Sequence, residues 1–80
     1  MNKSYLLFHL KEALKELQST VRELDNDPEY AEAEFYIAMQ HLYHHLNTAW
    51  NSRDLEEAKE ETEEQFSEWR QFPKDIDLST

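Results

Sequence analysis

The sequence predicts an all-α protein in which three helices form an antiparallel up-down-up bundle, a single domain over residues 1–80. Apolar residues recur at spacings of three and four along three segments, which is the period of one face of an α-helix. Two short polar stretches, near Asn26 and Asn51, separate the segments. Amphipathic helices joined by short turns pack as antiparallel neighbours, so we expect a bundle that is complete as a monomer or as half of a dimer.

The first helix is predicted over residues 4–25, where the periodic signal is strongest. Asn2 or Ser4 is expected to cap it, because such side chains accept hydrogen bonds from the free amide groups of a first turn. Its apolar seam has the alternating three- and four-residue spacing of a coiled-coil stripe. The seam consists of Leu7, Leu10, Leu14, Leu17, Val21 and Leu24.

The second helix is predicted over residues 28–50. Asp27 suits the position before a helix, and Pro28 suits the first helical position, where no amide hydrogen is needed. Apolar residues cover a wide arc of this segment, as expected for a helix that contacts two neighbours.

The third helix is predicted over residues 53–72, with Ser52 as its cap, Pro73 as its stop and residues 73–80 as a tail. The break at Asn51 is a weaker signal than the one at Pro28. A continuous helix from 28 to 72 is therefore the alternative, and it would require a partner chain. The predicted core of the three-helix bundle consists of Leu10, Leu14, Leu17, Phe35, Leu42, Leu46, Phe66 and Trp69.

The charge balance restricts the partners. Eighteen acidic residues against eight basic ones give a net charge of -10, which repels phosphate backbones and anionic membranes. No segment approaches the ~20 apolar residues of a membrane span. We therefore expect neither direct nucleic-acid binding nor membrane insertion. The absence of cysteine excludes disulfides and thiolate metal sites, and it favours a cytoplasmic location.

Signatures of catalysis are missing from the sequence. Without glycine there is no glycine-rich phosphate loop, and without cysteine there is no thiol nucleophile. No spacing brings serine and histidine together. The sequence therefore predicts a non-enzymatic protein without a cofactor, which acts by binding a partner protein or a second copy of itself.

The predicted interaction surface lies on one side of the second helix. Aromatic and amide side chains gather there at spacings of three, four and seven, and this composition is typical of interface hot spots. The surface comprises Tyr36, Gln40, Tyr43, His44, Asn47 and Trp50. Plain solvent exposure is the simpler expectation for Gln40 and Asn47, and burial in the core is the simpler one for the rings.

Two alternative functions belong to other classes. An acid-rich stretch can imitate a nucleic-acid backbone and occupy a basic cleft, although such stretches are more often solvated helix faces; it comprises Glu56, Glu57, Glu60, Glu61, Glu63 and Glu64. His41 and His45 share a helix face with Glu34, which is a pattern for metal binding or pH sensing, although most helical histidine pairs bind nothing. Relief of repulsion among the acids predicts that helix content holds or rises slightly down to about pH 5.

Overall fold

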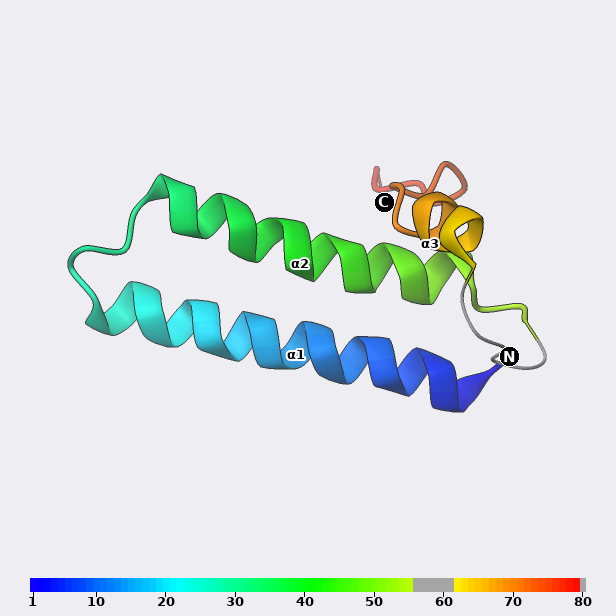
Figure 1. Ribbon diagram of the computed structural model, residues 1–80, viewed down its shortest axis with the longest axis horizontal. Helices are drawn as coiled ribbons and strands as arrows, with labels where there is room; N and C mark the ends of the chain where they lie inside the picture. The colour runs from blue at the N-terminus through cyan, green and yellow to red at the C-terminus, as the bar shows by residue number, and fades with distance from the viewer. Residues whose placement is uncertain (56–61, 80) are drawn as a thin grey trace.

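The computed structural model describes residues 1–55 and 62–79, and these residues contain three helices and no strand. Helix α1 (Lys3–Asn26) and helix α2 (Glu32–Asn51) form a long antiparallel hairpin, and the short helix α3 (Glu63–Trp69) stands beside its open end (Figure 1). The predicted all-α, three-helix fold class is confirmed. None of the helices in the described ranges is both long and apolar enough to cross a bilayer.

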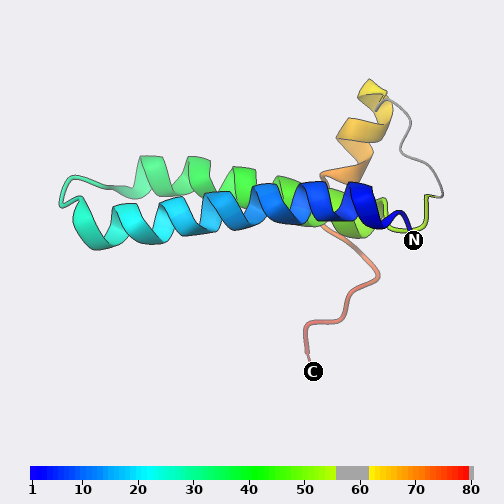
Figure 2. The ribbon, with the colours of Figure 1, turned by 90° about the horizontal axis from the view of Figure 1, so that it is seen from below.

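Helix α3 differs from its prediction in length and direction. It has seven residues and rises across the hairpin instead of lying along it, while the C-terminal tail leaves on the opposite side of the hairpin (Figure 2). Residues 53–55 of the predicted helix are not helical, and residues 56–61 lie outside the described residues. Thr62 caps the start of α3: its hydroxyl accepts from the amide of Gln65 at 3.1 Å, while the Gln65 side chain accepts from the amide of Thr62 at 3.2 Å.

The turn between α1 and α2 lies where it is predicted, but its hydrogen bonds differ from the prediction. The side chain of Asp27 accepts from the amide of Glu29 at 2.9 Å, and its carbonyl accepts from the amide of Tyr30 at 3.1 Å. Asp27 is therefore occupied in a tight turn through Pro28 and does not cap α2. Helix α2 begins four residues later than predicted, where the amide of Ala31 donates to the carboxylate of Glu34 at 2.8 Å.

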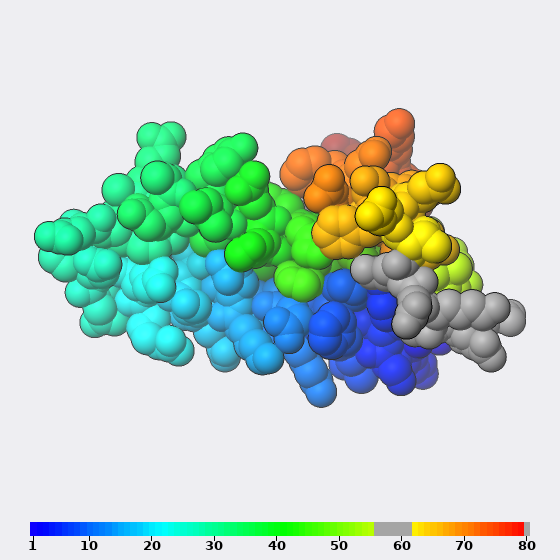
Figure 3. Space-filling model, in the orientation of Figure 1, coloured from blue at the N-terminus to red at the C-terminus, as the bar shows by residue number. Residues whose placement is uncertain are grey.

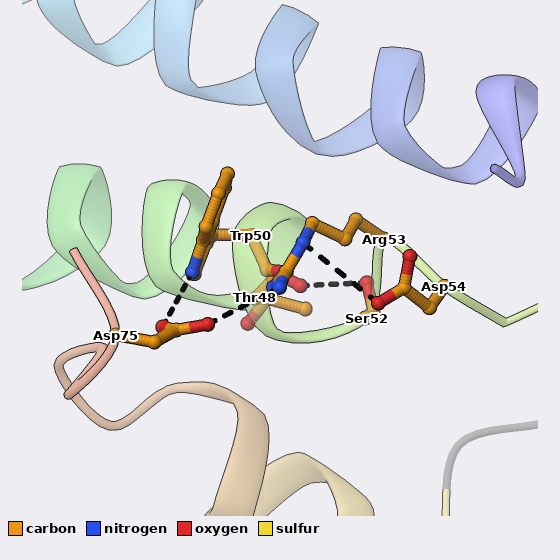
Figure 4. Close-up of polar contacts among 6 residues, drawn as sticks. All are labelled: Thr48, Trp50, Ser52, Arg53, Asp54 and Asp75. Carbon is orange, nitrogen blue, oxygen red and sulfur yellow. Dashed lines mark hydrogen bonds and ion pairs between the residues drawn. The ribbon is translucent and has the colours of Figure 1, made fainter.

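The break after α2 is real, and the continuous-helix alternative is wrong. Helix α2 ends at Asn51, and the hydroxyl of Ser52 donates to the carbonyl of Thr48 at 2.6 Å (Figure 4). Ser52 is almost completely buried. It thus closes the second helix and does not cap the third.

Side-chain amides attach α3 to α2. Asn47 donates to the carbonyl of Arg70 at 2.9 Å, and Asn51 donates to the carbonyls of Trp69 and Gln71 at 2.7 and 2.8 Å. Carbonyls at the C-terminal end of a helix have no partner within the helix, so these amides satisfy groups that would otherwise need water. Asn47 is buried, contrary to the solvent exposure expected for it.

The core of the hairpin consists of small residues. The buried apolar residues in the described ranges are Ala13, Ala38 and Ala49, and His9 and Thr20 are buried beside them. Small side chains let the two helix backbones approach closely, which leaves little room for large residues between them.

The predicted core is therefore mostly wrong. Leu42 and Trp69 are half-buried, but the other six predicted core residues are each at least 37% exposed: Leu10, Leu14, Leu17, Phe35, Leu46 and Phe66. The periodicity was that of a helix face, as predicted, but a different face of α1 contacts α2. At about 100° per residue, the leucine seam lies roughly 90° around the axis from the face of His9, Ala13 and Thr20.

We expect Asn51→Ala to loosen α3 without unfolding the hairpin. The substitution leaves two helix-end carbonyls without their amide donor, which costs about 1–3 kcal/mol. Hydrogen exchange should become faster at the amides of α3 and stay slow in α1. Gln40→Ala, which removes an exposed amide from the same helix, is the control. Equal exchange in both variants would show that α3 is held by other contacts.

Candidate functional site

Two surfaces of this molecule have the composition of binding sites. The first is the leucine face, which we define as Leu7, Leu10, Leu14, Leu17, Val21 and Leu24 of α1 with Phe35, Met39, Leu42 and Leu46 of α2. The six α1 side chains are 45 to 55% exposed. Soluble monomers expose single apolar residues routinely but seldom a continuous row of them.

Both helices contribute to the leucine face on one side of the hairpin. In an antiparallel pair, positions rotated in the same sense from the contact face lie on the same side. The α1 seam and the Phe35–Leu46 stripe are rotated in that common sense. The opposite rotation leads to a shallow hollow that is lined by Glu12, Lys15, Glu16 and Ser19 of α1 and by His41 and His45 of α2. One side of the hairpin is therefore apolar, and the other is polar.

The second surface is an open groove of about 980 Å³ between α2 and the α3 end of the chain. We call it the aromatic groove. Its α2 wall consists of Tyr36, Met39, Gln40, Tyr43, His44 and Asn47, with His41 and His45 toward α1. The facing wall consists of Phe66, Arg70, Gln71 and Phe72. In Figure 3, α3 and the segment after it stand above the surface of α2. They form the wall of the groove that faces α2.

Five of the six residues of the predicted interaction surface line this groove. Tyr43 packs edge-on against Phe72, with ring centroids 5.1 Å apart, and the ring of His44 lies 5.0 Å from that of Phe66. Tyr36 is 65% exposed. Asn47 reaches the groove but is held by its hydrogen bond to Arg70, so its main role is to position α3.

Trp50, the sixth predicted residue, lies outside the groove. Its indole nitrogen donates to Asp75 at 2.8 Å, and the guanidinium of Arg53 stacks 3.8 Å from its ring centroid (Figure 4). Arg53 also donates to Asp75 at 3.1 Å. The hydrogen bond from Trp50, with the nearby Arg53, lowers the pKa of the Asp75 carboxyl. Trp50 therefore fixes the start of the C-terminal tail.

A histidine cluster lies between the two helices of the hairpin. The Nδ1 atoms of His9 and His45 are 3.0 Å apart, and the His44 ring contacts both neighbours, 4.7 Å from His45 and 6.2 Å from His9 between centroids. A hydrogen bond between two Nδ1 atoms requires one of them to carry a proton and the other to accept it. The pair therefore suits neutral imidazoles.

Burial lowers the pKa of all three histidines. The pKa of His9 falls to about 4, first because burial disfavours the charged ring and then because His45 and His44 repel a second charge; Glu12 opposes this shift. Burial is also the main cause of the lowered pKa of His44 and His45, and Glu12 and Glu16 partly oppose it at His45. The cluster is uncharged at neutral pH.

The predicted metal-binding group is not assembled. Glu34 accepts the amide of Ala31, His45 faces His9, and His41 lies 4.0 Å from a carboxylate oxygen of Glu16. Within residues 1–55 and 62–79, no three histidine or carboxylate side chains are placed to hold a metal ion. The predicted acidic surface falls largely on 56–61, outside the described residues, while Glu63 and Glu64 form the first turn of α3.

The leucine face was not predicted from the sequence as an exposed surface. The signal was present: α1 carries a second stripe of small residues, Ala13 and Thr20, which matches Ala38 and Ala49 of α2.

Comparison of the chain with protein-family models, curated proteins and solved structures finds no significant match.

We expect acid to destabilise the hairpin through His9. Its folded pKa, about 4, lies below the ordinary histidine value of 6.5, so the unfolded chain binds the proton more readily. This contribution to stability is complete above pH 6.5 and is lost as the pH falls toward 4. The loss is on the order of 3 kcal/mol. Its sign is opposite to the effect expected from the acids alone.

Urea unfolding at pH 7.5 and at pH 5, at one protein concentration, measures this effect. His9→Gln should be less stable at neutral pH and should show a smaller decrease between the two pH values. His41→Gln is the control, because His41 is largely exposed. An equal pH dependence in wild type and His9→Gln would rule out His9 as the cause.

Proposed function

We propose that this chain is a non-enzymatic helical protein that acts by self-association through the leucine face. The observation that carries the proposal is the exposure of eight of the ten residues of the leucine face, on one side of a hairpin whose own apolar core is made of alanines. A surface of this kind is typical of a protein interface.

The exposed surface area of the chain is larger than that of a compact monomer of its mass, which supports the proposal that a partner covers part of it. The chain exposes 6578 Å², whereas a folded monomer of its 9.7 kDa mass exposes about 5100 Å². The radius of gyration is 14.4 Å, against about 11.6 Å for a compact domain of this length. The excess area exceeds the roughly 800 Å² per partner of a standard interface.

A second copy of the chain is the occupant that fits this face. The α1 seam repeats with the spacing that lets a helix interdigitate with another of the same pattern. Two hairpins stacked on their leucine faces give a four-helix bundle with an apolar centre and the polar sides outward. A two-fold interface of this kind needs only one self-complementary surface.

Burial of the leucine face in a dimer provides enough free energy for self-association. Complete burial of one leucine contributes roughly 1.5–3 kcal/mol, and each seam residue still has about half of its surface to bury. Six such residues on each protomer therefore provide several kcal/mol before α2 is included.

A cytoplasmic location and the absence of catalysis remain expectations from composition. No contact in the described residues favours the charge-mimic or metal-binding alternatives.

We expect the wild-type chain to sediment as a dimer at micromolar concentration and Leu14→Lys/Leu17→Lys to sediment as a monomer. Two charged side chains at the centre of the apolar face would have to be desolvated in the dimer. The dissociation constant should rise by about 100-fold or more, which corresponds to ~2.7 kcal/mol.

Phe8→Lys provides the control. Phe8 is 56% exposed on the same helix but lies outside the leucine face. This variant should remain dimeric. A wild-type chain that stays monomeric to about 100 μM, or an equal effect of Phe8→Lys, contradicts self-association through this face.

A further inference from the structure

We propose that the aromatic groove binds a peptide segment of a partner protein that presents a large apolar side chain beside a carboxylate. This site is separate from self-association. The groove follows the outer side of α2 and the α3 end, whereas the leucine face lies roughly 100° around α2 from it, and Met39 at the border belongs to both. A dimer stacked on its leucine faces would cover Met39 and leave the rest of both grooves open.

The apolar part of the ligand follows from the walls of the groove. Four aromatic rings border it, and each remains 37 to 66% exposed: Tyr36, Tyr43, Phe66 and Phe72. Aromatic rings combine large contact area with few rotatable bonds, so they lose little entropy when a ligand covers them. Between Tyr36 and Asn47 the α2 wall runs for roughly 16 Å, at 1.5 Å per residue. An extended peptide of about five residues has the same length.

The carboxylate follows from the charges in the groove. The chain has eighteen acidic residues, yet none of the described residues that line the groove is acidic. Arg70 lies on the α3 wall, with its guanidinium 5.0 Å from the centroid of Phe66, and it forms no ion pair with any described residue. Arg53, by contrast, is paired with Asp75. A guanidinium that is held over a ring and has no carboxylate partner within residues 1–55 and 62–79 suits a carboxylate of a ligand, which it binds through two parallel hydrogen bonds.

The other polar groups of the groove add hydrogen bonds but no charge. Gln40 and Gln71 are neutral amides at its rim. Burial lowers the pKa of His44 and His45, so these rings are neutral at pH 7. Arg70 is therefore the cation that selects the charge of the ligand.

The test uses two synthetic five-residue peptides and the full chain. One peptide has a central Leu between two Glu residues, and the other has Lys in place of both Glu. Because the chain as a whole has a charge of -10, non-specific attraction favours the Lys peptide. The groove instead predicts that the Glu peptide binds about fivefold or more tightly than the Lys peptide in a calorimetric or NMR titration.

Three variants locate the site. Arg70→Gln should weaken binding of the Glu peptide by about tenfold or more, and Tyr36→Ala should weaken binding of both peptides. Arg22→Gln makes the same change of charge on α1, away from the groove, and should change affinity less than about twofold. Circular dichroism confirms that each variant is folded.

The proposal is overturned if the Lys peptide binds as tightly as the Glu peptide, if neither binds at millimolar concentration, or if Arg22→Gln has the effect of Arg70→Gln. Sedimentation of the same samples reports self-association separately. Failure of peptide binding at the groove and failure of self-association through the leucine face are therefore distinguished.

Discussion

The contact between α1 and α2 determines most of what this molecule presents to its surroundings. Ala13, Ala38 and Ala49 bring the two helices close together, and a contact built from such small side chains has no space for leucine. Most of the larger aliphatic residues of both helices consequently lie on one side. The hairpin satisfies its backbone but leaves these side chains about half exposed, so apolar burial contributes less to its stability than it does in a compact bundle.

Polar contacts, rather than an apolar core, place the third helix. A helix of seven residues is too short to be stable alone in water. The amides of Asn47 and Asn51 bind the carbonyls at its C-terminal end, and Trp50 and Arg53 hold the following segment through Asp75. These contacts use consecutive turns of α2. They place α3 beside the end of α2, and the aromatic groove lies between α2 and the α3 end of the chain.

The histidines between the helices connect packing with charge. A buried imidazole pair is favourable while both rings are neutral, since one nitrogen donates and the other accepts. Protonation of both rings would place two positive charges 3.0 Å apart in a partly desolvated environment. We therefore expect the hairpin contact to weaken in acid, although the chain carries far more carboxylates than histidines. A surface dominated by acids therefore does not by itself set the response to pH.

The sequence by itself determined the helical class, the two breaks and five of the twelve described residues that line the groove. These are local properties, since they depend on periodicity, on capping side chains and on which residues share one side of a helix. It did not determine which stripe of α1 faces α2, because the leucine seam and the small-residue stripe are both helical in period. Only the tertiary structure decided between Leu14 and Ala13, through the close approach of two backbones. The direction of α3 was likewise decided by Asn47 and Asn51, whose amides could reach helix-end carbonyls that no sequence pattern places in space.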